Sequence, residues 1–302
     1  MRSMFVSRRS LLGAAAGATV AFGSQRVAAA PAAAYAPLVE LERRSGGRLG
    51  VAMLDTGNGS LAGHRLDERF GLCSMFKLPL AAVILSEADQ GRLALDRRVH
   101  YVAADVHGHA PVTTKHLARG YMTVAELAEA AQVTSDNPAA NLLLKLIGGP
   151  AGLTARLREF GDMTTRLDRM EPEMNHVPPG EVRDTTTPAA MARLVQKIAL
   201  GDVLERPTRE CLVGWMEKTQ TGLHRLRAGL PSAWRVGDKT GTYTNGELLG
   251  RVNDVAVCWP PGRAPLIVAA TYRTPRRGRD GVRDEDEAVL AEVGRIAAAW
   301  IA

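Results

Sequence analysis

The chain has 302 residues, of which 46% are hydrophobic and only 5% aromatic, so leucine, valine and alanine must form most of a substantial core, and the length alone suggests about two domains. Its formal net charge is +6, but Arg2, Arg8, Arg9 and Arg26 are the only charged residues of positions 1–30, and without that segment the net charge is +2. So small an excess gives no support for nucleic-acid binding.

Residues 1–30 have the pattern of an export signal. The pair Arg8-Arg9 precedes a mildly apolar run, Leu11–Gly23, and the small residues of Val27–Ala30 follow. This order is typical of a signal peptide, and paired arginines are typical of the twin-arginine route. The apolar run is shorter than the ~20 residues that span a membrane. We expect an exported protein, periplasmic or secreted, with no membrane segment in its mature form; the alternative is a disordered N-terminus.

The folded part of the chain is expected to begin with a helix and a strand. Apolar residues at helical spacing predict a helix over Tyr35–Arg44, with Leu38 and Leu41 on one side. An apolar run predicts a strand over Leu49–Asp55, and glycine and asparagine predict a turn over Thr56–Gly59.

The middle of the chain, from residue 74 to about residue 217, is predicted to consist of helices and loops. Thr187 before Pro188 marks a helix start, because threonine caps helix N-termini and proline favours the first helical position. The other helices are predicted from helical spacing or from helix-forming residues. The expected helices cover Met122–Thr134, Ala139–Ile147, Ala151–Phe160, Thr187–Leu200 and Pro207–Thr219.

The C-terminal part of the chain changes to strand patterns separated by turn signals. The basic run Arg273–Arg279 is followed by the acids Asp284–Glu287, which we interpret as a solvated loop that leads into a helix. The expected strands cover Trp234–Thr242, Gly250–Trp259 and Leu266–Arg273, with turns at Thr244–Gly246 and Pro260–Arg263 and a final helix over Asp284–Ala302.

Strands therefore lie at both ends of the mature chain, and helices lie between them. Short connections favour an α+β fold: an antiparallel sheet built from both chain ends and covered by helices, with an inserted all-helical domain. We expect a discontinuous α/β domain over residues 31–66 and 218–302, and a helical domain over residues 67–217. A cleft between the two is the expected ligand site.

Residues that could form disulfides or bind metals are few. Cys73, Cys211 and Cys258 allow at most one bridge, whereas disulfide-stabilised exported domains usually have an even and denser set. We expect three buried thiols. His107, His109 and His116 could suggest a metal site, but they have no nearby cysteine or spaced carboxylates, so we expect none there.

Ser74 and Lys77 stand three residues apart at the start of a predicted helix, in a chain where only six of 38 basic residues are lysine. A serine at a helix start has free backbone amides and the positive helix end, which stabilise an oxyanion. One turn brings the lysine to the same side. Apolar surroundings lower a lysine pKa, and a neutral amine could activate the serine. The alternative is a capped helix whose lysine reaches water.

Two further short motifs place hydroxyls beside predicted elements. Ser135–Asn137 precedes a helix, and it could be an N-cap or could shuttle a proton and hold a substrate amide. Lys239–Thr242 lies at the end of a predicted strand, where a lysine and two hydroxyls could bind a carboxylate and Gly241 would let a ligand approach the backbone. The alternative there is an edge strand with a solvated lysine.

A stretch with little periodicity, Asp168–Thr187, contains Glu171 and Asn175 four residues apart. Long ordered loops in compact domains are often functional. One helical turn could direct both side chains to the same water, and a carboxylate beside a water is a general base. The alternative is a solvated turn.

These four motifs occur in one order at wide spacings. They are Ser74-x-x-Lys77, Ser135-Asp136-Asn137, Glu171-x-x-x-Asn175 and Lys239-Thr240-Gly241. Together they resemble the motif set of the class A serine β-lactamases. The resemblance covers essentially the whole mature chain, including Arg183–Pro188 and Trp234–Asp238.

The resemblance implies a chemical role for each matching residue. Ser74 would be the acylated nucleophile and Lys77 its proton-network partner. Glu171 would activate the deacylating water, which Asn175 would help to hold. Ser135 would pass a proton to the departing lactam nitrogen. Whether Lys77 or Glu171 starts acylation is left open within the family.

The resemblance also implies how substrate is held. Asn137 would contact the acylamino side chain of the substrate. Lys239, Thr240 and Thr242 would bind its carboxylate. The backbone N–H groups of Ser74 and Thr242 would form the oxyanion hole.

Some positions match the family less closely. Arg225 stands in a region from which some members supply a carboxylate-supporting arginine, and Val252 stands where others supply it; the alternative for Arg225 is a surface arginine. His109 replaces a common aromatic gate residue, Met174 replaces leucine, and Tyr121 resembles a one-residue insertion.

Two further features belong to this resemblance. Arg169 and Asp184 match a pair that braces the loop. Carbapenem-hydrolysing members can bridge a cysteine at the place of Cys73 to a second one, but Tyr243 occupies that second place, so we predict no such bridge.

We therefore expect a β-lactamase that opens the β-lactam amide of penicillins or cephalosporins through a serine acyl-enzyme and confers antibiotic resistance. No metal or organic cofactor has a role in this scheme, and we expect a monomer with a small-molecule substrate and neither a nucleic-acid nor a membrane partner. A penicillin-binding DD-peptidase shares the serine–lysine and Lys-Thr-Gly elements but lacks the Glu171–Asn175 loop. A non-hydrolysing β-lactam sensor would not need the deacylation residues.

Overall fold

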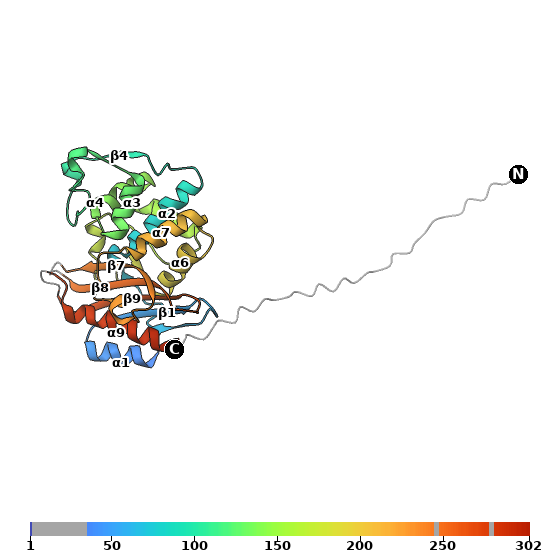
Figure 1. Ribbon diagram of the computed structural model, residues 1–302, viewed down its shortest axis with the longest axis vertical. Helices are drawn as coiled ribbons and strands as arrows, with labels where there is room; N and C mark the ends of the chain where they lie inside the picture. The colour runs from blue at the N-terminus through green and yellow to red at the C-terminus, as the bar shows by residue number, and fades with distance from the viewer. Residues whose placement is uncertain (2–34, 245–247, 278–280) are drawn as a thin grey trace. The chain divides into compact units, whose positions relative to one another are not determined.

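The computed structural model describes residue 1 and residues 35–244, 248–277 and 281–302 (Figure 1). The export signal predicted over residues 1–30 lies outside this part apart from Met1, as do Asn245 and Gly246 of a predicted turn. The described residues form a five-stranded antiparallel sheet with helices on both faces. This is the α+β fold expected from the sequence.

The sheet joins strands from the two ends of the chain, in the order β2-β1-β9-β8-β7. All of its neighbouring strands are antiparallel. The four predicted strands are confirmed with bounds shifted by a few residues, whereas the short strand β2 gave no sequence signal. The bounds are β1 Arg48–Asp55, β2 Leu61–His64, β7 Arg235–Tyr243, β8 Leu249–Trp259 and β9 Leu266–Arg277.

Both faces of the sheet are buried. Along β1, Ala52 and Leu54 pack into one hydrophobic cluster, and Val51 and Met53 pack into a second cluster on the opposite face. Strands that are buried on both faces read as continuous apolar runs, which is why the alternation is weak in the sequence. One face is covered by α1 (Ala36–Ser45) and α9 (Asp284–Trp300), which are seen below the sheet in Figure 1. The short helix α8 (Leu226–Gly229) packs against α9 and β8.

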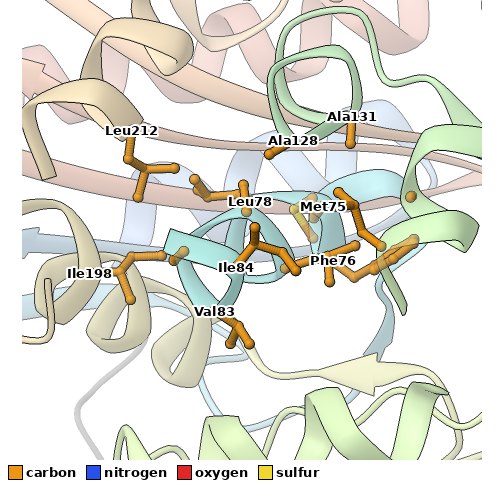
Figure 2. Close-up of a cluster of buried hydrophobic side chains, with 14 of the residues drawn as sticks. Met75, Phe76, Leu78, Val83, Ile84, Ala128, Ala131, Ile198 and Leu212 are labelled. Carbon is orange, nitrogen blue, oxygen red and sulfur yellow. The ribbon is translucent and has the colours of Figure 1, made fainter. Parts of the chain in front are cut away.

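Helix α2 (Lys77–Asp89) lies at the centre of the helical part and is buried from Lys77 to Glu87. Its apolar side chains contact the helices around it, and Leu78 and Ile84 belong to the same cluster as Ala128 of α3, Ile198 of α6 and Leu212 of α7 (Figure 2). Each fully buried aliphatic side chain stabilises the fold by about 1.5–3 kcal/mol. The surrounding helices are α3 Val124–Val133, α4 Asn137–Leu146, α5 Gly149–Glu159, α6 Pro188–Leu200 and α7 Arg206–Glu217.

Capping side chains set several helix starts. Thr123 and Glu126 form a capping box at α3, and Thr187 caps α6 as predicted. The helix predicted from Met122 therefore begins two residues later, because residues 121–123 form a strand instead. The remaining short strands are β3 Phe70–Gly71, β4 Arg98–His100, β5 Tyr121–Thr123 and β6 Thr185–Thr186, which pair as β3 with β6 and β4 with β5.

Two expectations about local structure were wrong. Residues 273–277 are not a loop, because β9 continues to Arg277 and pairs there with Leu249 of β8. Cys211 is exposed on α7, whereas Cys73 and Cys258 are buried as expected; all three are free thiols.

The division into a discontinuous domain and an inserted helical domain stays a prediction. Among the described residues, no helix is both long enough and apolar enough to cross a membrane. No group of three or more potential metal ligands occurs in that part of the chain either.

Candidate active site

The four motifs meet at one cavity, with a volume of about 250 Å³. Its walls come from the turn before α2, the α3–α4 junction, the loop before β6 and the strand β7. Thr221 was not predicted from the sequence and also lines it. The lining residues are Ser74, His109, Ser135, Asn137, Glu171, Asn175, Thr221, Thr240 and Thr242.

Ser74 lies in a 3₁₀ turn, Cys73–Phe76, that runs directly into α2. The turn is entered through Cys73 at φ +45°, a strained conformation for a residue with a side chain. The Lys77 Nζ donates to the Ser74 Oγ at 3.0 Å. Since the Lys77 side chain is 0% exposed, the alternative of a lysine that reaches water is wrong.

The Lys77 ammonium lies among oxygen acceptors from three motifs. It donates to the Ser135 carbonyl at 2.8 Å and to the Asn137 Oδ1 at 2.5 Å, and it lies 3.4 Å from the Glu171 Oε1. Burial lowers the pKa of Lys77, and the nearby Glu171 carboxylate opposes that shift. The amine is therefore closer to losing its proton than an exposed lysine, although it sits beside an acid.

Ser135 connects the two motif lysines. Its Oγ accepts from the Lys239 Nζ at 3.1 Å and lies 3.4 Å from the Lys77 Nζ. Its backbone has φ +62°, a conformation that side-chain-bearing residues seldom adopt outside functional sites. Asp136 instead caps α4 by accepting from the Ala139 N–H, which confirms the capping interpretation, and Ser135 and Asn137 on either side of it line the cavity.

Glu171 is 3% exposed and faces Ser74, with its Oε1 3.5 Å from the Ser74 Oγ. The Asn175 amide donates to the Glu171 Oε2 at 2.5 Å. Asn141 of α4 holds the Glu171 backbone twice, accepting from its N–H at 3.0 Å and donating to its carbonyl at 2.9 Å. Asn141 was missed because an asparagine inside a helix carries no motif of its own.

The loop is also braced where Arg169 meets Asp184, as the sequence resemblance implies. The Arg169 Nε lies 2.6 Å from the Asp184 Oδ2, and Asp184 is fully buried at φ +56°. The other oxygen of Asp184 accepts from the N–H groups of Asp168 and Arg169. This carboxylate therefore fixes the start of the loop at several points.

Lys239 lies within β7 and behind the cavity wall. Its side chain is 0% exposed and donates to the Ser135 Oγ and to the Thr240 carbonyl at 2.9 Å. Burial, and then the charge of Lys77, lower its pKa well below the ordinary value. β7 is an edge strand, but the solvated lysine considered for it is wrong. The hydroxyls of Thr240 and Thr242, not the lysine, form the wall itself.

Gly241 has a packing role that the sequence did not suggest. A Cβ at this position would lie 2.8 Å from the Leu72 carbonyl and 3.1 Å from the Cys73 Cβ. Only glycine therefore lets β7 approach the turn that carries Ser74 this closely. The side of Gly241 that a Cβ would occupy is filled by protein rather than by ligand space.

Arg225 is 3% exposed, so it is not a surface arginine. It donates to the Thr242 Oγ1 at 2.8 Å, to the Asn253 carbonyl at 2.9 Å and to the Glu287 Oε1 at 2.8 Å. It supplies a positive charge directly behind the Thr242 hydroxyl.

Two residues complete the rim. The His109 ring lies on the cavity with its Nε2 2.9 Å from the Thr134 carbonyl. The Thr221 Oγ1 lies 2.6 Å from the Thr240 Oγ1. Thr221 follows α7 in an irregular segment, where no sequence pattern pointed to it.

The arrangement has the parts that acyl transfer requires. A serine hydroxyl contacts a buried amine, a carboxylate lies within reach of the same hydroxyl, and the Thr242 hydroxyl of the cavity wall accepts from the buried Arg225 guanidinium. Such a site can attack a carbonyl, and it can hold an anionic group beside the attacked atom.

Comparison with known proteins gives consistent matches. The model of the β-lactamase enzyme family matches residues 33–301. The carbapenem-hydrolysing β-lactamase KPC of Klebsiella oxytoca is 46% identical over 261 residues, 86% of each chain. The β-lactamase L2 of Stenotrophomonas maltophilia is 47% identical over 289 residues, 95% of this chain and 91% of its own.

Solved structures give the same match. A class A β-lactamase representing the last common ancestor of Gram-negative bacteria is 55% identical, with a TM-score of 0.82 over 88% of this chain and 98% of its own. A β-lactamase of Xanthomonas campestris pv. campestris is 46% identical, with a TM-score of 0.82 over 88% of this chain and 97% of its own.

Proposed function

Because this chain belongs to the class A β-lactamase family, we propose that it opens β-lactams through an acyl-enzyme on Ser74. The protein is a hydrolase that acts on β-lactams and supports antibiotic resistance. One observation carries the assignment of the nucleophile: the Ser74 Oγ has the Lys77 Nζ at 3.0 Å and the Glu171 Oε1 at 3.5 Å, inside one cavity.

In acylation, the Ser74 oxygen bonds to the lactam carbonyl carbon and the carbon–nitrogen bond of the ring breaks. The serine proton passes first to a base, and both Lys77 and Glu171 are within reach of it. The backbone N–H groups of Ser74 and Thr242 stabilise the oxyanion.

The departing lactam nitrogen needs a proton. The Ser135 hydroxyl supports this step, because it lies between the Nζ atoms of Lys77 and Lys239. A proton given by Ser135 can therefore be replaced from Lys77, which also contacts the nucleophile. Lys239 donates to the Ser135 hydroxyl and so keeps that hydroxyl oriented.

In deacylation, Glu171 takes a proton from water as the water oxygen attacks the ester carbon, and the Ser74 oxygen recovers a proton as it leaves. The Asn175 amide holds the second oxygen of Glu171, so the carboxylate keeps one oxygen directed at the ester. Removal of the acyl group distinguishes a hydrolase from an acyl-trapping protein.

We propose that the substrate carboxylate binds at the Thr240 and Thr242 hydroxyls. Arg225 donates to the Thr242 hydroxyl and so contributes charge and orientation there, whereas Lys239 donates to the Thr240 carbonyl and contributes from behind the wall. Asn137 and His109 also line the cavity, where Asn137 would contact the acylamino group and His109 would pack over the substrate.

We propose that residues 1–30 direct export by the twin-arginine route and that the mature protein acts as a periplasmic or secreted monomer. Its partner is a small-molecule β-lactam, and neither nucleic acid nor membrane takes part.

Turnover with a chromogenic cephalosporin and with benzylpenicillin, followed together with intact mass, tests the proposal. Many turnovers per enzyme and a transient adduct on Ser74 are expected. A stable adduct without turnover would instead indicate a DD-peptidase or a sensor. Turnover that persists in Ser74→Ala would show that the nucleophile is wrong.

A further inference from the structure

Arg251 of β8 lies beside the catalytic loop but belongs to none of the four motifs. It is 6% exposed, although arginine is seldom buried without partners. It stands directly opposite Tyr243 of β7, with its guanidinium carbon 5.3 Å from the centre of the tyrosine ring. Its position is therefore fixed from the sheet side.

The guanidinium donates to two carbonyls at the end of the Glu171 loop. Its Nη1 lies 3.3 Å from the Asn175 carbonyl, and its Nη2 donates to the Val177 carbonyl. Asn175 is the residue whose amide holds the Glu171 Oε2. Arg251 thus contacts the backbone of the residue that orients the catalytic carboxylate.

Two arginines stand in line with Arg251 across β9 and β1, so the Asn175 and Val177 carbonyls are needed to stabilise its buried charge. Arg251 is directly opposite Arg273 of β9, which is directly opposite Arg48 of β1. Like charges in opposite positions are destabilising, and burial together with Arg48 and Arg251 lowers the pKa of Arg273. Among the described residues, no carboxylate lies within ion-pair distance of Arg251. Within the described part of the chain, its partners are the two loop carbonyls and the Tyr243 ring.

The same face of β8 holds the nucleophile turn. Two residues beyond Arg251, the Asn253 amide donates to the Gly71 carbonyl at 2.9 Å and the Leu72 carbonyl at 3.4 Å. Alternate residues of a strand point to the same side, so Arg251 and Asn253 form one platform. One segment of β8 therefore sets the spacing between Ser74 and the loop that must deliver water to it.

We propose that Arg251 is a positioning residue for deacylation, which holds the Asn175 backbone so that the Glu171 carboxylate stays aimed at the acyl-enzyme. This inference rests on the proposed acyl-enzyme function. Arg251 touches no reacting atom and acts through Asn175. The charge matters less than the two-point contact, because only the planar guanidinium fork reaches two carbonyls at once.

The test compares Arg251→Gln, Arg251→Lys and Arg273→Gln with the wild type. Arg273→Gln is the matched control, because it removes an arginine opposite Arg251 that contacts no loop carbonyl. In Arg251→Gln we expect deacylation to slow by on the order of tenfold to a hundredfold, as for other small misplacements of catalytic groups. Arg251→Lys should be intermediate, and Arg273→Gln should match the wild type.

The kinetic signature separates positioning from general damage. When deacylation alone slows and becomes rate-limiting, kcat and KM fall together and kcat/KM stays constant, and intact mass shows the acyl-enzyme at steady state. Loss of folded enzyme would lower kcat and leave KM unchanged. An unchanged deacylation rate in Arg251→Gln, or a fall in kcat alone, would overturn the proposal.

Two safeguards keep the result interpretable. Circular dichroism and thermal unfolding show whether Arg251→Gln folds. If it does not, Arg251→Lys takes its place, because lysine retains the charge and most of the side-chain stem. A wild-type deacylation rate in Arg251→Lys would still contradict the proposal. A wild-type enzyme that forms no acyl adduct would refute the proposed function itself, whatever Arg251 does.

Discussion

The two walls of the cavity are held in different ways. The strand wall, Lys239–Thr242 of β7, is bonded along its backbone to β8, with Lys239 opposite Val255 and Thr242 opposite Val252. The loop wall, Glu171–Asn175, contains only a short 3₁₀ turn and has no strand partner. Side chains hold it instead: Asn141 at the Glu171 backbone, the Arg169–Asp184 pair, and Arg251 at the Asn175 carbonyl.

This difference has a consequence for catalysis. Backbone ladders survive the replacement of any one side chain, whereas a loop fixed by side chains loses a contact with each substitution. In the proposed mechanism, the strand wall contributes substrate binding and the loop wall contributes deacylation. Substitutions should therefore separate the two halves of the reaction according to the wall that they touch.

The largest expected effect is that of Glu171→Ala on the loop wall. Without its general base, deacylation should fall by roughly 10²- to 10⁴-fold, and the acyl-enzyme should accumulate. Intact mass during turnover measures this directly. Glu173→Ala is the control, because Glu173 is exposed two residues away. Unchanged steady-state turnover in Glu171→Ala would remove its proposed role.

The second prediction compares one buried amide behind each wall. Asn141→Leu should slow deacylation by on the order of tenfold to a hundredfold, because both of its bonds hold the Glu171 backbone. Gln132→Leu loses a bond to the Asp238 carbonyl, but Thr219 still donates there at 2.7 Å, and the ladder remains. Equal kinetic effects in these two variants would contradict the distinction between the walls.

On the strand wall, Arg225→Gln should weaken substrate binding. The loss of the cation behind Thr242 should raise KM by on the order of tenfold and change kcat little, which is the pattern of lost uniform binding. Arg235→Gln at the other end of β7 is the control, because Arg235 is exposed and pairs with Glu217 at 3.2 Å. Accumulation of acyl-enzyme in Arg225→Gln would indicate that Arg225 acts in deacylation, and it would contradict the proposed role in substrate binding.

The last prediction concerns stability on the strand wall. Burial and Lys77 lower the folded-state pKa of Lys239 below the unfolded value of 10.5, so between those two pKa values the unfolded chain binds more protons. The contribution of Lys239 to the free energy of unfolding therefore increases as the pH rises towards 10.5. Compared with Lys239→Met, the wild type should become relatively more stable from pH 7 to pH 10. Urea unfolding at several pH values measures this, and a constant difference would contradict it.

Much of the fold was predictable because local patterns agree with it. Apolar runs located β1, β7, β8 and β9, and the Thr187-Pro188 pair located the start of α6. Errors arose where tertiary pairing extended an element, as in residues 273–277, which continue β9 only because Leu249 of β8 lies opposite Arg277. Helical spacing alone likewise could not show that Cys211 faces solvent.

The sequence by itself determined the family and the residues of the four motifs, because acyl transfer needs particular functional groups and these are written directly in the chain. Only the tertiary structure decided how those groups are supported. Asn141, Thr221 and Arg251 come from segments without a motif, and their importance depends on distances across the fold. The burial of Lys239 behind the hydroxyl wall is likewise a property of packing, since a lysine in an edge strand has no local signal that distinguishes a buried from a solvated side chain.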